Sequence, residues 1–411
     1  MTDVSFANLL SVDDARSRVL ESVEPLATED VSLHDALGLV TATEIRAPHS
    51  LPRFDNSAMD GYAVIAEDTT GAGEYSPVEL DVVGEVRAGG SDEAVVEPAT
   101  AARIMTGAPL PPGADAIVMV EATEERDGKV LVRASAEPGQ HVRPAGDDLN
   151  EGEVLVPEGL ELGPGELALL GSMGVTPIEV RRGPRVALLV TGDELVDPEE
   201  EPGPGQIRDS NQLALLALLE QAGARPALSE RVPDKREAVV GAFKRAAEAA
   251  DLVVSSGGVA VGKYDFVKDV VEELGHIELW RVAMQPGKPV VLGSVEDVPF
   301  LGLPGNPVSV HVGFEQFVRP AIRKMRGCRS LLRSTLGATL TETITKRPGR
   351  LHFVRVRLAN RDGGWFATPT GPQGSHIQSS LIDCHGVARF GREEARLDEG
   401  QRVTVELWRL P

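Results

Sequence analysis

Apolar residues in the second half of the chain alternate between two spacings. Four short apolar runs, at 185–190, 225–232, 252–254 and 299–303, are typical of buried strands. Each run is followed by a stretch with helical apolar spacing, at 210–223, 236–250, 266–274 and 308–320. Four successive strand–helix pairs predict a parallel sheet with crossover helices.

The patterns on either side of this segment differ. Ser11 and Asp14 form a capping box that predicts a helix to Val23, and a second short helix is expected over 33–37. Short β-rich runs separated by Gly and Pro fill 62–156, a helix is expected over 165–174, and strand alternation returns after Gly327. These patterns predict a multidomain protein of class α/β plus β.

Composition narrows the class of partner. The chain has 411 residues, with 41 Lys and Arg against 63 Asp and Glu, which gives a formal net charge of −22. This charge disfavours nucleic acid and anionic membranes as partners. Cys328 and Cys384 show no paired spacing, and no signal peptide or membrane span is recognised, so we expect a reducing, cytoplasmic location.

The stretch "DLVVSSGGVAVGKYDF", residues 251–266, connects a strand to a helix through glycines. In parallel sheets the carboxyl ends of strands and the amino ends of helices converge on anions. Gly257 and Gly258 would allow close approach of the backbone to a ligand. The alternative is that these glycines serve only to turn the chain.

Other polar residues are expected at the same sheet edge. "TGDELV" places Asp193 and Glu194 after the first strand, and "GLPGNPVSV" places Asn306 and Pro307 at the start of a helix. Lys288 in "MQPGKPV" is suited to a phosphate or another oxyanion. Carboxylates such as Glu194 and Asp265 beside an anion are consistent with a bridging Mg²⁺. Taken singly, each carboxylate is better explained by helix capping or solvation, and it is their convergence on one sheet edge that favours a functional interpretation.

Several polar turns lie outside this segment. They contain Asp55 and Asp60, Thr106, Asp147 and Asp148, and the cluster Ser375, His376, Ser379 and Ser380. Turn chemistry alone would account for each of them. No Ser/His/Asp arrangement, GxSxG motif, Walker lysine loop or Rossmann fingerprint is found, which removes the main support for hydrolase, P-loop and nicotinamide functions.

Taken together, seven motifs resemble the molybdopterin molybdenumtransferases, the family of the bacterial MoeA proteins and the gephyrin E domain. They are "FDNSAMDGYAV", "RIMTGAPLPPGADAIV", "TGDEL", "SSGGVAVGKYDF", "PGKP", "GLPGNPVS" and "TGPQGSHIQSS", in the family's order from Phe54 to Ser380. The resemblance implies an N-terminal mixed domain (1–50 and 142–180), a β-rich insert (51–141), a molybdopterin-binding parallel α/β domain (181–327) and a small C-terminal β-barrel-like domain (328–411).

The resemblance also implies an activity. A member of the family inserts molybdate into the dithiolene of adenylylated molybdopterin, with Mg²⁺, and releases AMP and the molybdenum cofactor. It implies a homodimer in which each active site lies between the α/β domain of one subunit and the β insert of the other. A molybdopterin adenylyltransferase and proteins that deliver the cofactor to molybdoenzymes are the implied protein partners.

Site residues follow from the same resemblance. Glu194 and Asp265 would bind the metal, and Asp234 and Lys288 would join them as catalytic residues. The substrate-binding residues implied are Asp60, Thr106, Asp148, Ser256, Gly257, Gly258, Lys268, Gly305, Asn306, Pro307, Arg350 and Ser375.

One position departs from the family pattern. Gln285 stands where many relatives have a basic residue, and Arg208 is the hypothesised replacement for that cation. Two other functions are kept as alternatives: a molybdopterin adenylyltransferase, which would need only the α/β segment, and a non-catalytic cofactor carrier or scaffold.

Overall fold

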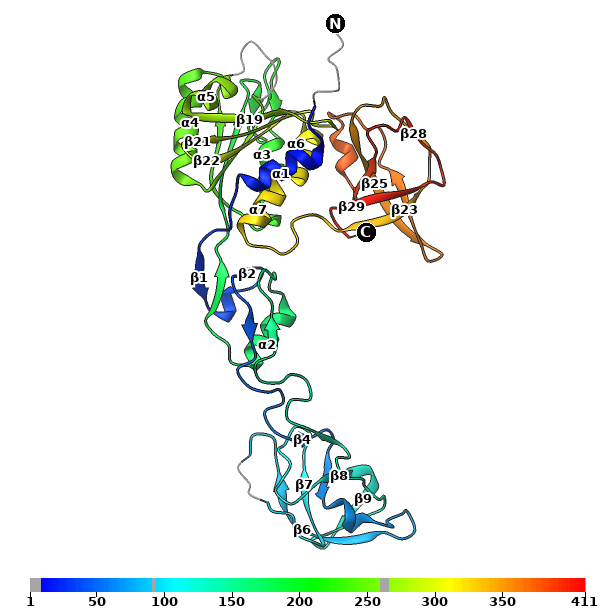
Figure 1. Cartoon of the computed structure of the whole chain (residues 1–411). Helices are drawn as coiled ribbons and strands as arrows, with labels where there is room; N and C mark the ends of the chain where they lie inside the picture. The colour runs from blue at the N-terminus through cyan, green and yellow to red at the C-terminus, as the bar shows by residue number, and fades with distance from the viewer. Residues whose placement is uncertain (1–8, 91–93, 259–265, 411) are drawn as a thin grey trace. The chain divides into compact units, whose positions relative to one another are not determined.

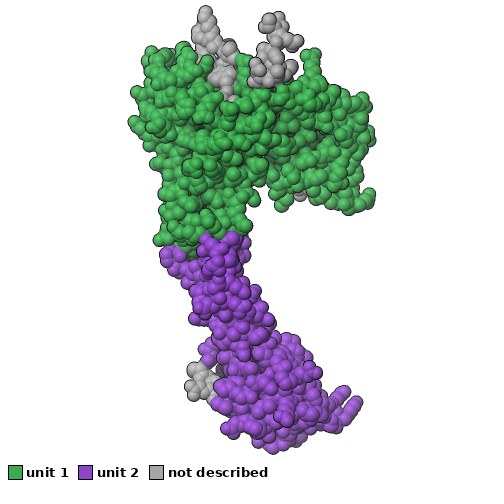
Figure 2. Space-filling model, viewed as in Figure 1, with its two compact units in different colours: residues 1–43, 158–163, 178–411 green, residues 44–157, 164–177 purple. Residues whose placement is uncertain are grey.

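The computed structural model describes residues 9–90, 94–258 and 266–410. Contacts divide the chain into two compact units, which are coloured separately in Figure 2. Unit 1 comprises residues 1–43, 158–163 and 178–411, and unit 2 comprises residues 44–157 and 164–177. No helix in the described ranges is long and apolar enough to cross a membrane.

A six-stranded sheet forms the centre of unit 1, in the order β17-β14-β18-β22-β21-β19. The first four strands in this order pair in parallel, whereas β21 pairs antiparallel with both β22 and β19. The strands are β14 (Arg185–Thr191), β17 (Arg225–Val232), β18 (Leu252–Ser256), β19 (Gly275–Arg281), β21 (Pro289–Val295) and β22 (Val298–Leu303).

Helices cover both faces of this sheet (Figure 1). Val254 and Leu301 pack on one face with α1, α3, α6 and α7, and Val253 and Phe300 pack on the other with α4 and α5. Burial on both faces explains why these strands are continuous apolar runs rather than alternating ones. The helices are α1 (Val12–Glu21), α3 (Asn211–Gln221), α4 (Arg236–Ala249), α5 (Phe266–Leu274), α6 (Pro307–Gly313) and α7 (Arg319–Met325), with a π-helical turn, η5 (Phe314–Val318), between the last two.

The C-terminal part of unit 1 is a closed sheet. Its order is β20-β25-β26-β23-β29-β27, and an additional pairing of β25 with β27 closes it. Closure removes exposed strand edges. Its strands are β20 (Met284–Gln285), β23 (Thr335–Leu340), β25 (Leu351–Arg361), β26 (Gly364–Pro369), β27 (Gly386–Phe390) and β29 (Arg402–Leu407), accompanied by the pair β24 (Ile344–Thr345) and β28 (Arg396–Leu397) and the 3₁₀ turn η6 (Gln378–Leu381).

Three smaller pieces complete unit 1. A three-stranded sheet has the order β1-β13-β2, and β15 pairs in parallel with β16. Their bounds are β1 (Thr28–Val31), β2 (Val40–Thr41), β13 (Ile178–Arg181), β15 (Leu195–Val196) and β16 (Ile207–Arg208), with the 3₁₀ turn η2 (Leu33–Asp35).

Unit 2 is built on a six-stranded sheet of order β8-β5-β7-β6-β10-β9, with the short pairs β11-β4 and β12-β3. Its elements are β3 (Ile45–Arg46), β4 (Asn56–Ser57), β5 (Gly61–Val64), η3 (Ala66–Thr69), β6 (Val78–Val86), β7 (Thr100–Ile104), β8 (Ala116–Met119), η4 (Val120–Ala122), β9 (Thr123–Arg126), β10 (Lys129–Val132), β11 (Val142–Arg143), β12 (Val154–Val156) and α2 (Pro164–Ser172).

The fold class expected from the sequence is confirmed, with two differences in detail. The predicted capping box is present, because the Ser11 hydroxyl accepts the Asp14 N–H at 3.0 Å. The first difference is that the helix expected over 33–37 is only the 3₁₀ turn η2. The second difference is that the sheet is mixed rather than wholly parallel. The exception is β21, which joins β22 through a two-residue hairpin turn at Glu296 and Asp297 and so runs antiparallel to it. The edge strand β19 pairs antiparallel with β21 and therefore runs in the same direction as β18 and β22.

A carboxylate network fixes the amino-terminal ends of the two central strands. Asp251, just before β18, accepts hydrogen bonds from the guanidinium groups of Arg182 (2.5 and 2.8 Å) and Arg185 (3.0 Å) and from the backbone N–H of Arg185 (2.8 Å). Burial alone would raise the pKa of the Asp251 carboxyl, but these hydrogen bonds outweigh it and hold the pKa well below its usual value. The network therefore stabilises the pairing of β14 with β18.

We expect Asp251→Asn to weaken this pairing by about 1.5–3 kcal/mol at neutral pH, because hydrogen bonds to a charged group are lost. A carboxyl whose folded pKa is depressed contributes stability above its unfolded pKa, near 4, and loses it as the pH falls towards the folded value. Hydrogen exchange at the β14 and β18 amides should therefore be faster in the variant at pH 7, with the difference narrowing below about pH 4. The control is Asp398→Asn, which breaks the exposed pair with Arg396; equal protection in both variants would contradict the assignment.

Candidate functional site

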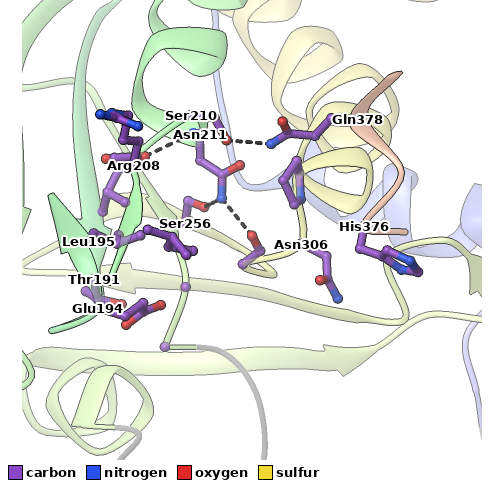
Figure 3. A pocket seen from close by; sticks show the side chains of 18 of the residues that line it. Thr191, Glu194, Leu195, Arg208, Ser210, Asn211, Ser256, Asn306, His376 and Gln378 are labelled. Carbon is purple, nitrogen blue, oxygen red and sulfur yellow. Dashed lines mark hydrogen bonds between the residues drawn. The ribbon is translucent and has the colours of Figure 1, made fainter. Parts of the chain in front are cut away.

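A cavity of about 930 Å³ lies where the strands β14, β18 and β22 end. The start of α3, the loop before α6 and residues 376 and 378 of the C-terminal part complete its wall (Figure 3). The sequence-expected residues that line it are Glu194, Asp234, Ser256, Gly257, Gly258, Gly305, Asn306 and Pro307. These residues come from four separate loops and meet at one edge of the sheet. The first and last of them, Glu194 and Pro307, are 113 positions apart in the sequence.

The glycines after β18 are required by the backbone. Gly257 and Gly258 have φ values of +88° and +64°, which favour glycine. A Cβ atom on Gly257 would lie 2.6 Å from the carbonyl oxygen of Thr191, and the Gly257 N–H donates to the carbonyl of Leu303 at 3.1 Å. The loop is therefore packed tightly between the ends of β14 and β22.

The helix α6 begins at the cavity with Asn306 as its N-cap and Pro307 at its first position. The Asn306 side chain makes no capping hydrogen bond. The Val308 N–H instead donates to the carbonyl of Ser375 at 3.2 Å. Ser375 thus approaches the site through its backbone, as a contact from the C-terminal part to the helix start.

A second contact joins the C-terminal part to α3. The amide of Gln378 donates to the hydroxyl of Ser210 at 2.6 Å (Figure 3). Gln378 and His376 both line the cavity. Sequence reasoning missed Gln378 because the polar loop around it gives no sign of a partner 168 positions away.

The acidic side of the cavity contains Glu194 and Asp234. The backbone N–H of Asp234 donates to the Asp193 carboxylate at 3.0 Å, and the Asp193 N–H donates to the Asp234 carboxylate at 3.4 Å. Burial raises the pKa of Asp234, and the negative charges of Asp193 and Glu194 raise it further, against the hydrogen bond from the Asp193 N–H. A cation placed here would relieve that repulsion.

Mg²⁺ commonly takes one or two carboxylates together with phosphate oxygens, and Glu194 and Asp234 fit that requirement. Within the ranges the structure describes, no group of three His, Cys, Asp or Glu side chains is arranged to hold a metal ion. Asp265, the other expected ligand, lies outside the described residues.

Two polar residues at the start of α3 were not identified from the sequence. The buried Asp209 accepts the N–H groups of Asn211 (2.9 Å) and Gln212 (3.1 Å), so it neutralises the amino end of this helix. Asn211 donates to Ser256 and Gly305, which are the ends of two other loops. The "DSN" stretch before an apolar helix carries a capping signal, but capping alone does not reveal these contacts.

The expected basic residues are not gathered in the cavity wall. Lys288 and Arg350 are partly buried. Lys268 is exposed, and its Nζ lies 3.7 Å from Oε1 of Glu272. None of the three lines the cavity. Arg208 does line it, but its guanidinium donates to the Pro198 carbonyl and to Glu201, each at 3.0 Å. The structure thus provides no support for Arg208 as the replacement for a cation at Gln285.

A buried guanidinium, which the sequence did not identify, holds the loop of the C-terminal part that contains Ser375 and Gln378. Arg355 is fully buried and donates to the Ser380 hydroxyl (3.0 Å) and to the carbonyls of Gly374 (3.2 Å) and Pro372 (3.4 Å). Burial lowers its pKa to about 10. Its Nη1 atom has no hydrogen-bond partner among the described residues. Arg355 therefore fixes the loop that presents Ser375 and Gln378.

The remaining expected residues lie in unit 2. The Asp60 carboxylate accepts the N–H of Thr106 at 2.7 Å and its hydroxyl at 2.8 Å, and these bonds lower the pKa of Asp60. Asp148 is exposed, and its N–H donates to the Leu51 carbonyl at 3.0 Å. Unit 2 thus presents an ionised, accessible carboxylate held by Thr106.

We expect Gly257→Ala to destabilise the α/β sheet by about 1–3 kcal/mol, because alanine at this positive φ is strained and its Cβ meets the Thr191 carbonyl. The matched control is Gly241→Ala inside α4, where a Cβ meets only the end of the Arg245 side chain at 3.3 Å and no backbone atom of another element. Alanine there should be neutral or stabilising by up to about 1 kcal/mol. Thermal unfolding of both variants checks the difference, and equal midpoints would show that the loop accommodates a side chain.

Comparison with known proteins places this architecture in one family. Three family models match: the MoeA N-terminal region (domain I and II) at residues 10–174, a probable molybdopterin binding domain at 187–324, and the MoeA C-terminal region (domain IV) at 337–408. The second of these ranges contains most of the cavity wall.

Relatives match over nearly the whole chain. The molybdopterin molybdenumtransferase of Haemophilus influenzae is 37% identical over 402 residues, covering 97% of this chain and 98% of that protein. Molybdopterin molybdenumtransferase 2 of Mycobacterium tuberculosis is 38% identical over 401 residues, with coverages of 96% and 98%. A crystal structure of a molybdopterin biosynthesis MoeA protein from Pyrococcus horikoshii is 34% identical, with a TM-score of 0.83 and coverages of 98% and 100%. The chain therefore belongs to the molybdopterin molybdenumtransferase (MoeA) family.

Proposed function

We propose that the protein inserts molybdate into the dithiolene of adenylylated molybdopterin and releases AMP and the molybdenum cofactor. The observation that carries this proposal is the cavity at the ends of β14, β18 and β22, which is lined by the loop at 256–258 and by the carboxylates of Glu194 and Asp234. The family model over 187–324 and the names of the relatives support a molybdopterin ligand there.

The chain's own residues supply binding and placement. The backbone around Ser256, Gly257 and Gly258 and the amino end of α6 would hold the phosphoanhydride. Lys288 would counter the charge of phosphate or molybdate, and Lys268, Arg350 and Ser375 would bind the substrate around the cavity, whose described wall contains none of these four residues. The two dithiolene thiols bind molybdenum in place of one oxo group of molybdate, which leaves as water with the two thiol protons. A second water adds across the phosphoanhydride, and AMP leaves. Fixed dipoles and charges stabilise such a reaction without a covalent intermediate.

Glu194 and Asp234, with Asp265, would hold Mg²⁺. When bound, the ion neutralises phosphate charge and polarises the phosphoanhydride. Without a cation, the two carboxylates that line the cavity would repel the anionic substrate. The position of Glu194 and Asp234 in one cavity wall is the structural observation that supports this assignment.

Assembly and location belong to the same proposal. The protein would act as a cytoplasmic homodimer, with Asp60, Thr106 and Asp148 contributed by the partner subunit to each site. The division into four domains (1–50 with 142–180, 51–141, 181–327 and 328–411) is proposed as well. Family matches outside the α/β segment, at 10–174 and 337–408, disfavour an adenylyltransferase built on that segment alone.

The first experiment is AMP release from adenylylated molybdopterin by the purified protein with Mg²⁺, in the presence and absence of molybdate. We expect release to require both ions and to be accompanied by activation of a molybdenum-free apoenzyme. Binding of the adenylylated pterin without molybdate-dependent release would instead indicate the carrier function.

Asp234→Asn should keep the side-chain shape and remove one charge from the acidic side of the cavity. We expect AMP release to fall by about 10²–10³-fold, because an electrostatic contact to the reacting centre is lost, and the Mg²⁺ requirement to shift to higher concentration. The matched control is Glu237→Gln in the exposed first turn of α4. Equal activity and Mg²⁺ dependence in the two variants would remove Asp234 from the site.

A further inference from the structure

Asn211, the first residue of α3, connects three loops of the cavity (Figure 3). Its side-chain Nδ2 donates to the Ser256 hydroxyl oxygen at 3.1 Å and to the Gly305 carbonyl oxygen at 2.7 Å. Ser256 ends β18, and Gly305 precedes α6. One amide group therefore holds the two loops to which we assign phosphate binding.

The orientation of the Asn211 amide is fixed by chemistry. A carbonyl oxygen can only accept, so the nitrogen must face Gly305 and the amide oxygen must point elsewhere. The second hydrogen of the same nitrogen goes to Ser256, which leaves both N–H groups occupied. The backbone of Asn211 is held as well, because its N–H donates to the Asp209 carboxylate at 2.9 Å.

This arrangement decides what Ser256 can do. Its oxygen accepts from Asn211, and an amide nitrogen cannot accept in return, so the hydroxyl hydrogen remains for another acceptor. Among the described residues no acceptor for that hydrogen is found, and Ser256, although only 1% exposed, lines the cavity, so a ligand in the cavity can supply the acceptor. A phosphate oxygen is an acceptor of this kind.

We propose that Asn211 is a positioning residue that makes Ser256 a hydrogen-bond donor to a phosphate oxygen of the bound nucleotide. The inference rests on the proposed function for the identity of the ligand. Aspartate at 211 would reverse the arrangement: it would accept the Ser256 hydrogen, face the Gly305 carbonyl with a second acceptor, and add a charge beside the phosphate.

The test measures binding of AMP, and of adenosine as the ligand without phosphate, to the full-length protein by calorimetry. The variants are Asn211→Ala, Asn211→Asp, Ser256→Ala and the doubles of Ser256→Ala with each Asn211 change. The matched control is Gln212→Glu, the same amide-to-acid change at the next residue, whose side chain donates to Ser229 at 2.8 Å and does not line the cavity.

We expect AMP affinity to fall about 10-fold in Asn211→Ala, because the Ser256 hydroxyl is no longer oriented towards the phosphate. We expect a fall of about 100-fold in Asn211→Asp, because the aspartate accepts the Ser256 hydrogen and also repels the phosphate. Gln212→Glu should change it by no more than about 3-fold, and adenosine affinity should stay within about 2-fold throughout. On the Ser256→Ala background, the further loss from Ala to Asp should shrink, because no hydroxyl remains to be misdirected.

Three outcomes would overturn the inference. In the first, Asn211→Asp lowers AMP affinity no more than Gln212→Glu does. In the second, the loss of AMP affinity from Ala to Asp at 211 is the same with and without the Ser256 hydroxyl. In the third, the affinities for AMP and adenosine fall equally, as expected for a collapsed site. Wild-type protein that fails to bind AMP would overturn the proposed function and the inference together. Thermal unfolding distinguishes a misfolded Asn211→Asp from a misdirected Ser256, and Asn211→Ala provides a second variant.

Discussion

Parallel pairing of β14, β18 and β22 is the constraint on which the site depends. The register aligns Val190 with Ser256 and Ser256 with Leu303, so three strands end at the same level. Each strand is buried on both faces, and a slip of one residue would exchange the residues facing the two helix layers. The positions of the loops that follow these strands are thus set by packing far from the ligand.

Close approach of the loops follows from that alignment and restricts the residues that can occupy them. Gly257 lies against Thr191 and donates to Leu303, so it contacts the ends of both neighbouring strands. The proposed function places an anion beside these loops, in a protein with a net charge of −22. The carboxylates of Glu194 and Asp234 would repel such an anion, and the proposed Mg²⁺ would relieve that repulsion.

The sequence predicted the parts of this site that are encoded in short stretches. The loop around Ser256 and the start of α6 are recognisable because glycine, proline and the flanking apolar runs are adjacent in the chain. The roles of Asn211 and Gln378 could not be predicted, because their partners lie 45 to 168 positions away and depend on strand order. The antiparallel strand β21 was not predicted for a similar reason: its direction depends on its hairpin connection to β22, not on its own apolar pattern.

The C-terminal closed sheet belongs to the site by the same physical reasoning. A fully buried guanidinium is costly to desolvate, and Arg355 is compensated by a hydroxyl and two carbonyls, with no carboxylate recorded near it in the described residues. An apolar side chain at this position would avoid that cost but would remove the guanidinium donor from the carbonyls of Pro372 and Gly374, of which Gly374 would keep only the Ile377 N–H at 3.2 Å. The loop they belong to places the Ser375 carbonyl on α6 and the Gln378 amide on α3. Burial of Arg355 therefore costs stability in the C-terminal sheet, but it fixes the loop that connects this sheet to the amino ends of α3 and α6 at the cavity.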